Sequence, residues 1–317
     1  MEAMLQWGLD VIRFIHRIFG PAPSDTLPAS VMRILSGLGS PAAYLIALPF
    51  VYWCVNEKKG VSLGTAVFVS IWLNLFLKFI LDQPRPFFPG YDPSVDITGQ
   101  AGSAANTTGG FPSGHAQNTL VMWIIIASWG KKKLFYGAAA FWCVLVGFSR
   151  IYLGAHFPTD VLGGWVIGGL ILCIYFLFEK RIETTLKAGG TRAGLITAAA
   201  LSFFMILYRP SEIILIPAGI TLGMAAGYCL NRLYIGFTVS ALFGRTGISL
   251  YLTLAGRYTV GTAVLVLLYI STGKLTSVLI NSGNYDLVVF LRYALLALWV
   301  FSGAPLLFRF TRLAEQS

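Results

Sequence analysis

Long apolar segments alternate with short polar connections along the whole chain. Nine segments approach or exceed the roughly 20 residues that a helix needs to cross a bilayer. They lie at about 36–56, 61–81, 113–130, 133–151, 158–178, 193–208, 211–230, 258–272 and 287–308. The strict alternation expected of barrel strands is not visible. The pattern therefore predicts an all-α bundle of transmembrane helices.

Two regions fit this pattern less simply. Residues 5–19 mix apolar side chains with Asp10, Arg13 and Arg17, which predicts an amphipathic helix at the membrane interface within an N-terminal segment 1–27. His16 stands alone on that segment, and we expect a surface or interfacial role for it. The stretch 234–257 has a lower apolar density, so it could lie at the interface or form another span.

The composition agrees with a membrane protein. The chain is 56% hydrophobic and 11% charged, with a mean hydropathy of +0.73, and so has too little polar surface to cover a water-soluble globule. Its formal charge of +10 is scattered over short loops, which argues against a nucleic-acid partner. The four cysteines lie in apolar stretches without metal-type spacing, so neither a metal site nor a disulfide is expected.

Basic residues predict the orientation in the membrane. If the first span begins outside, the lysines and arginines of the short loops collect on one side, which should be cytoplasmic. These residues are Lys58, Lys59, Lys131, Lys132, Lys133, Lys180, Arg181, Lys187, Arg192, Arg232, Arg309 and Arg312. The loop 82–111 and the turn 150–158 then face the periplasm or exterior, as in a bacterial inner membrane protein.

Three polar stretches open on this non-cytoplasmic side. They are 78–86 (KFILDQPRP), 112–115 (PSGH) and 149–160 (SRIYLGAHFPTD). Charge at the ends of apolar segments is costly unless it has a function. Pro112 and Pro158 suit the first turn of a helix, so two spans should point their amino ends at a common site. Such ends favour an anion, to which Ser113 adds a hydroxyl and Gly114 an accessible backbone.

The charged side chains of these stretches suggest phosphate chemistry. Lys78, Arg85 and Arg150 can surround a tetrahedral oxyanion, with bidentate donors from arginine and a point charge from lysine. We assign His156 as a nucleophile toward phosphorus and His115 as the general acid. Asp160, four residues after His156, can hold that imidazole in the attacking tautomer. A buried polar network that only joins the spans is the alternative.

These stretches resemble the three signature motifs of the type 2 phosphatidic acid phosphatase (PAP2) superfamily. Lys78 is followed after six residues by Arg85, PSGH stands at 112–115, and Arg150 is followed by His156 and Asp160. The resemblance covers roughly 28–187. It implies a helical bundle, catalysis without metal or cofactor, and a phosphohistidine at the third-motif histidine. It carries over Lys78, Arg85, Ser113, Gly114, His115, Arg150, His156 and Asp160 in the roles given above.

Residues 188–317 exceed that core and are expected to form a C-terminal transmembrane extension. The nine-span layout and the local WLNLFLKFILDQPRP also look like the glucose-6-phosphatase branch. That branch lacks an acid at the position of Asp160, so a lipid phosphate is favoured as substrate over a sugar phosphate.

The predicted function is hydrolysis of the terminal phosphate of a phospholipid or prenyl (di)phosphate. Alternatives are a phosphotransferase, a sugar-phosphate phosphatase of the glucose-6-phosphatase type, and a non-catalytic lipid carrier or flippase. The glycines at 219, 223 and 227 would permit close helix packing within or between subunits, which leaves a homo-oligomer open. The loop with Asn106, Gly109 and Gly110 could be a lid or only a spacer.

Overall fold

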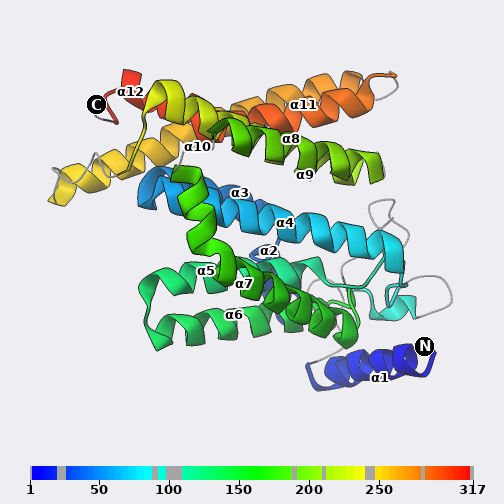
Figure 1. The fold of residues 1–317 in the computed structure, drawn as a ribbon. Coiled ribbons are helices and arrows are strands. Elements are labelled where there is room, and N and C mark those ends of the chain that lie inside the picture. Colours follow the sequence, from blue (N-terminus) through cyan, green and yellow to red (C-terminus); the bar gives the residue numbers. More distant parts are fainter. Residues whose placement is uncertain are drawn as a thin grey trace. The chain divides into compact units, whose positions relative to one another are not determined.

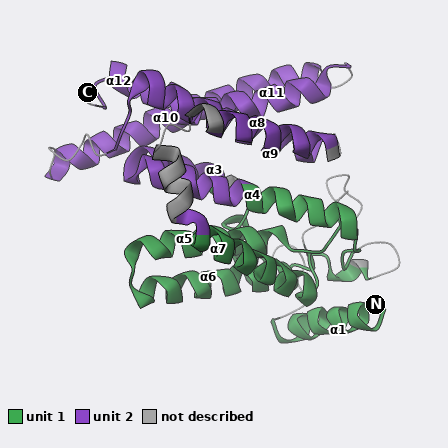
Figure 2. Ribbon diagram, in the orientation of Figure 1, with its two compact units in different colours: residues 1–44, 69–177 green, residues 45–68, 178–317 purple. Residues whose placement is uncertain are grey.

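The computed structural model describes residues 2–19, 26–87, 92–97, 109–187, 191–208, 212–239, 247–279 and 283–314. Regular secondary structure in these ranges is helical and includes no strand (Figure 1). The predicted all-α fold is therefore confirmed. The chain divides into two compact units (Figure 2). Unit 1 comprises Met1–Tyr44 and Val69–Leu177, and unit 2 comprises Leu45–Phe68 and Phe178–Ser317.

Unit 1 holds α1 (Glu2–Phe19), α2 (Leu27–Gly37), η2 (Pro93–Val95), α5 (Gly114–Gly130) and α6 (Lys133–Tyr152). It also takes the second part of α4 (Glu57–Leu81) and most of α7 (Pro158–Lys187). Helices α5 and α6 pack against each other, and α2 packs on α6. Lys131 makes the tight connection from α5 to α6 in a left-handed conformation, with φ 52°.

Helix ends in unit 1 bring two sequence motifs together. Ser113 caps α5, and its hydroxyl oxygen accepts a hydrogen bond from the Ala116 amide at 3.5 Å. The Ser113 amide in turn donates to the carbonyl oxygen of Asp160 at 2.9 Å. Gly154 turns the chain between α6 and α7 at φ +67°, and a Cβ there would lie 1.9 Å from the Val95 carbonyl oxygen. That position therefore requires glycine.

Unit 2 contains most of α3 (Pro41–Phe50) with η1 (Val51–Val55), and the first part of α4. It continues with the following helices: α8 (Thr191–Tyr208), α9 (Glu212–Leu230), η4 (Asn231–Ile235), α10 (Gly247–Val278), α11 (Tyr285–Leu298), η6 (Trp299–Gly303) and α12 (Ala304–Phe310). Helix α9 packs on α8 and α11. A Cβ on Gly223 would lie 2.1 Å from the Ala294 carbonyl oxygen, so this glycine permits a close α9–α11 approach within one chain.

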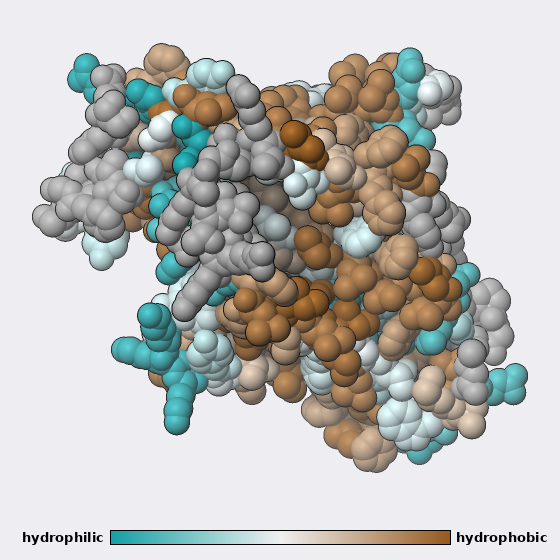
Figure 3. Space-filling model, in the orientation of Figure 1, coloured by the Kyte–Doolittle hydropathy of each residue, from teal (hydrophilic) through white to brown (hydrophobic). Residues whose placement is uncertain are grey.

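In the described part of the chain, six helices are long and apolar enough to cross a membrane: Glu57–Leu81, Lys133–Tyr152, Pro158–Glu179, Glu212–Ile235, Gly247–Val278 and Tyr285–Phe310. Shorter apolar helices lie at Ala43–Val55 and Gly194–Leu207, and α5 has 17 residues. Figure 3 shows hydrophobic side chains over much of the face in view, as expected for helices that contact lipid. The chain is a multi-pass membrane protein.

Two boundaries differ from the predicted spans. Helix α10 begins at Gly247, well before the predicted start near residue 258, so residues 247–257 of the ambiguous stretch belong to a long helix. Arg245, within the same stretch, lies outside the described residues. The predicted segment 36–56 is divided, since α2 ends at Gly37 and α3 begins at Pro41. Proline at the start of α3 suits a new first turn.

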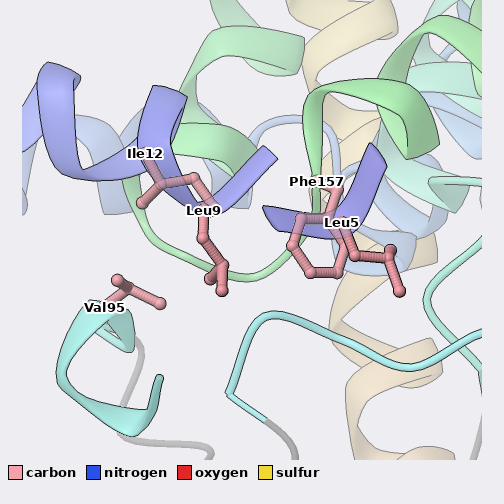
Figure 4. Close-up of a cluster of buried hydrophobic side chains, with 5 residues drawn as sticks. All are labelled: Leu5, Leu9, Ile12, Val95 and Phe157. Carbon is pink, nitrogen blue, oxygen red and sulfur yellow. The ribbon is translucent and has the colours of Figure 1, made fainter. Parts of the chain in front are cut away.

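Helix α1 forms as predicted, but protein covers the apolar face that we expected to enter lipid. Leu5, Leu9 and Ile12 are buried in a cluster with Val95 and Phe157 of unit 1 (Figure 4). His16 is not isolated, because its Nε2 lies 2.8 Å from the carbonyl oxygen of Tyr152. His16 is half-buried, so it does not stand alone as expected. Its surface or interfacial role, and contact of the outward face of α1 with the membrane interface, stay predictions.

Candidate active site

A buried histidine and aspartate form the centre of the candidate site. His156 and Asp160 are 2% and 1% exposed, and His156 Nδ1 lies 3.2 Å from Asp160 Oδ2. The same carboxylate oxygen accepts a hydrogen bond from the Phe157 amide at 3.0 Å. The His156 amide donates to the Arg150 carbonyl oxygen at 3.3 Å, which closes the turn between α6 and α7. The carboxylate thus fixes the orientation of the imidazole through Nδ1, and Nε2 is the ring nitrogen that this contact does not use.

The surroundings keep His156 uncharged. Burial is the largest cause that lowers the pKa of its imidazole well below the ordinary value, and the positive charges of Arg85, Lys78 and Arg150 act in the same direction, followed by His115. A neutral imidazole is the form that can attack an electrophile. Because the charge of His115 contributes to this shift, the two predicted catalytic histidines are close enough to interact electrostatically.

Three cations converge on this pair, each anchored to unit 1. Lys78 Nζ donates to the carbonyl oxygens of Gly109 and Gly110 at 2.6 and 2.9 Å. Arg85 donates to the Ala155 carbonyl oxygen at 3.4 Å, and Arg150 donates to Ser36 Oγ at 2.6 Å. Gly109 and Gly110 form the described end of the predicted lid or spacer, whereas Asn106 lies outside the described residues.

The charges of this cluster suit a dianion. Lys78, Arg85 and Arg150 are all at most 7% exposed, and Asp160 is the buried carboxylate among them. Among the described residues of this cluster, three positive side chains and one negative side chain leave a surplus of two, before any proton on His115 is counted. Burial lowers the pKa of Arg85, while the charge of Asp160 opposes that change. Arg150 Nε is buried and has no hydrogen-bond partner among the described residues, a donor that an anion would satisfy.

The amino end of α5 completes the site. Its first backbone N–H groups have no partner inside the helix and favour negative charge. A Cβ on Gly114 would lie 2.9 Å from Asn74 Oδ1, so glycine lets α5 start close to α4. His115 is partly exposed in this first turn. The structure therefore brings together all eight predicted site residues within unit 1.

A buried polar network behind the site escaped the sequence reasoning. Asn74 Nδ2 donates to the Pro112 carbonyl oxygen at 3.2 Å and to Gln117 Oε1 at 2.9 Å. Gln117 Nε2 donates to the carbonyl oxygen of Ser70 at 2.8 Å. Asn74 stands one helical turn before Lys78, and amides within apolar spans are costly unless they are satisfied. The presence of Asn74 and Gln117 in apolar spans was therefore the sequence signal that could have predicted this network.

Side chains in the described ranges include no group of three or more His, Cys, Asp or Glu that could hold a metal ion. The cationic side chains and backbone N–H groups of the site favour an anion over a cation. Together, the apolar helices and this cationic cluster describe a membrane protein with a buried group of side chains suited to an anion.

Comparison with protein families identifies the group to which the chain belongs. Residues 59–183 match the model of the PAP2 superfamily. Residues 216–316 match the transmembrane extension of PAP2 superfamily phosphatases. The chain is a member of the PAP2 superfamily, as its three motifs suggested.

Individual relatives fall into two kinds. Glucose-6-phosphatase catalytic subunit 1 of Rattus norvegicus is 31% identical over 233 residues, which cover 65% of this chain and 62% of the relative. Phosphatidylglycerophosphatase B of Bacillus subtilis is 35% identical over 120 residues, covering 35% and 53%. Undecaprenyl-diphosphatase of Sulfolobus acidocaldarius is 30% identical over 144 residues, covering 42% and 64%. The chain thus spans less than two thirds of each relative. No solved structure matches it.

Proposed function

We propose that this chain is a membrane phosphatase that hydrolyses the terminal phosphate of a lipid phosphate or diphosphate through a phosphohistidine. The observation that carries the proposal is the buried His156–Asp160 pair beside Lys78, Arg85 and Arg150. A neutral nucleophile and a surplus of two positive charges are what transfer of a dianionic phosphoryl group requires.

The proposed reaction has two steps. His156 Nε2 attacks phosphorus, the bond from phosphorus to the ester oxygen breaks, and His115 gives its proton to the departing oxygen. Asp160 stabilises the positive ring of phospho-His156 through Nδ1. In the second step water attacks phosphorus and gives a proton to His115, the bond from phosphorus to His156 Nε2 breaks, and inorganic phosphate and free His156 result. The three cations and the first amides of α5 hold the non-bridging oxygens.

A lipid substrate is supported by the bilayer setting and by two relatives. The names of the Bacillus subtilis and Sulfolobus acidocaldarius relatives refer to a phosphorylated glycerolipid and a prenyl diphosphate. Both molecules present a terminal phosphate on an apolar anchor, so a site at a helix end would meet such a group at the membrane surface. From the charge distribution of the loops we expect that surface on the non-cytoplasmic side, as in a bacterial inner membrane.

The test is phosphate release by the full chain in detergent with a chelator. The panel contains dioctanoyl phosphatidic acid, a short-chain prenyl diphosphate and dioctanoyl phosphatidylglycerophosphate, with His156→Ala as the blank. We expect release from at least one lipid by the wild type and none by the variant. Phosphate on an added alcohol acceptor instead of in solution would indicate a phosphotransferase. Lipid binding without release would indicate a carrier and overturn the proposal.

A second candidate is hydrolysis of a soluble sugar phosphate. It is favoured by one observation, the similarity to the rat glucose-6-phosphatase subunit, which extends over 65% of this chain, against 35% and 42% for the two lipid phosphatases. Glucose 6-phosphate therefore belongs in the same panel. A kcat/KM for glucose 6-phosphate at least tenfold above that of every lipid would establish this candidate in place of the first.

A further inference from the structure

Helix α1 lies against the turn that carries the candidate nucleophile. Its apolar face buries Leu5, Leu9 and Ile12 with Val95 and Phe157 (Figure 4). Phe157 is 1% exposed and directly follows His156. A segment more than 130 residues away in sequence therefore packs on the residue next to the nucleophile.

Gly8 shows how close this contact is. A Cβ on Gly8 would lie 2.6 Å from Cδ1 of the Phe157 ring and 3.4 Å from its Cγ. No side chain fits there unless the ring moves. The backbone of α1 thus rests directly on the Phe157 ring, and α1 limits the movement of that ring toward the surface.

Phe157 is in turn joined to both members of the histidine–aspartate pair. Its amide donates to Asp160 Oδ2, the same oxygen that meets His156 Nδ1. Its carbonyl oxygen accepts from the amides of Asp160 and Val161 at 3.0 and 3.4 Å, which starts α7. A displacement of Phe157 would therefore change the position of the carboxylate relative to the imidazole.

Two polar contacts hold α1 to the same region. His16 Nε2 lies 2.8 Å from the Tyr152 carbonyl oxygen, at the end of α6. Arg13 donates to Asp92 Oδ2 at 2.7 and 3.0 Å, and Asp92 precedes the short η2 turn that ends at Val95. The side chains of Arg13 and Asp92 are 39% and 22% exposed, so solvent weakens this ion pair and the apolar cluster is the stronger tie.

The η2 turn also links α1 to the turn from the other side. The Val95 carbonyl oxygen lies so close to Gly154 that a Cβ there would be 1.9 Å away, and the Ile97 amide donates to the Leu153 carbonyl oxygen at 3.2 Å. Residues 152–157 are thus held between α1 and η2, three to eight residues before Asp160.

From these contacts we infer that α1 positions the catalytic turn, with Gly8 and Phe157 as the positioning residues that keep Asp160 aligned with His156. The inference rests on the proposed function, because it assigns α1 a part in the reaction of that same site. Gly8 and Phe157 touch neither substrate nor the reacting atoms. Their effect should reach the chemical step through the geometry of the pair.

The test compares Gly8→Leu with Ala3→Leu in the full chain in detergent. Ala3 lies on the exposed face of the same helix, so both variants add one leucine side chain to α1. With dioctanoyl phosphatidic acid we expect Gly8→Leu to lower kcat by about 10- to 100-fold, since small misplacements of catalytic groups have effects of that size. KM should stay within about twofold because the cations are not displaced, and Ala3→Leu should match the wild type.

A double-mutant cycle separates positioning from loss of folded protein. Asp160→Asn should lower kcat much less in the Gly8→Leu background than in the wild type, because both changes disturb the same pair. A loss of folded enzyme would instead multiply with the effect of Asp160→Asn. The inference would be overturned if the two substitutions lowered kcat by independent, multiplying factors, or if Gly8→Leu had the kcat of the wild type.

Anion binding gives a second measurement that does not depend on turnover. Orthovanadate can bond to a histidine nitrogen and mimic the pentacoordinate transition state, whereas inorganic phosphate tests only the cationic cluster. By calorimetry we expect Gly8→Leu to weaken vanadate binding about tenfold or more and phosphate binding less than twofold. Equal losses for both anions would refute positioning. A wild type that binds both anions but hydrolyses none of the panel would instead refute the proposed function.

Discussion

Replacement of Asp160 by asparagine tests the central pair most directly. The Asp160 carboxylate is 1% exposed, lies 3.2 Å from His156 Nδ1 and accepts from the Phe157 amide. Asparagine has nearly the same shape and can still accept the Phe157 hydrogen bond, but it cannot stabilise a positive ring. A hydrogen bond with a charged partner contributes about 1.5–3 kcal/mol, and about 1.4 kcal/mol corresponds to a tenfold change in rate. We therefore expect kcat to fall by about 10- to 150-fold.

Asp160→Asn should leave KM unchanged or lower it, whereas general damage to the site would raise KM. Removal of one negative charge raises the positive surplus of the cluster from two to three, so a dianionic phosphate should bind as tightly or more tightly. Steady-state hydrolysis of dioctanoyl phosphatidic acid measures both constants, and Asp286→Asn on the exposed first turn of α11 is the matched control. An unchanged kcat, or a raised KM with an unchanged kcat, would show that Asp160 does not act on phospho-His156.

Three further predictions concern pH, the network behind the site and unit 2. On the acid side of the pH profile, kcat/KM should fall only below the ordinary range of histidine pKa values, because activity is lost when pH drops through the lowered pKa of His156. Arg85→Gln removes the largest charge effect on that pKa and should shift the acid-side fall of kcat/KM to higher pH. Asn74→Leu, which leaves the Pro112 carbonyl oxygen and Gln117 without their donor, should lower kcat/KM about tenfold and lower the melting temperature, whereas Thr65→Leu outside the network should do neither. Gly223→Leu would enter the space of the Ala294 carbonyl group and should destabilise unit 2 by about 1–3 kcal/mol in denaturant titration, whereas Gly194→Leu, with nothing nearby, should not.

Local signals explain why the proximity of the candidate site residues could be predicted from the sequence. Pro158 and the cap Ser113 mark the starts of α7 and α5, and helix starts fix where the motifs lie in space. Because short connections force neighbouring spans to run in opposite directions, alternate helix ends share one side of the membrane. The motif residues therefore converge once the spans are placed correctly.

The role of α1 could not be predicted in the same way. Its apolar face is what an amphipathic helix shows whether lipid or protein covers it, so Leu5, Leu9 and Ile12 carry no signal about the partner. The sequence alone does not show that Gly8 contacts Phe157, whose ring carbon Cδ1 lies 2.6 Å from the Cβ position of Gly8. The predicted start of α10 near residue 258 was wrong for a related reason. A helix keeps its backbone hydrogen bonds where it extends beyond an apolar span, so a drop in apolar density does not mark the end of the helix.

The charge balance of the site shows how the fold can hold three buried cations before any substrate binds. Burial of charge is costly unless the hydrogen-bond donors are satisfied. Backbone carbonyl oxygens accept many of these hydrogen bonds here. Lys78 uses those of Gly109 and Gly110, Arg85 that of Ala155, and Arg150 the hydroxyl of Ser36. Carbonyl and hydroxyl partners satisfy hydrogen bonds without neutralising charge, so they leave the positive surplus of the described side chains available to an anion. Carboxylates at the same places would stabilise the empty site more and bind phosphate less, which explains why Asp160 is placed against His156 and not against the arginines.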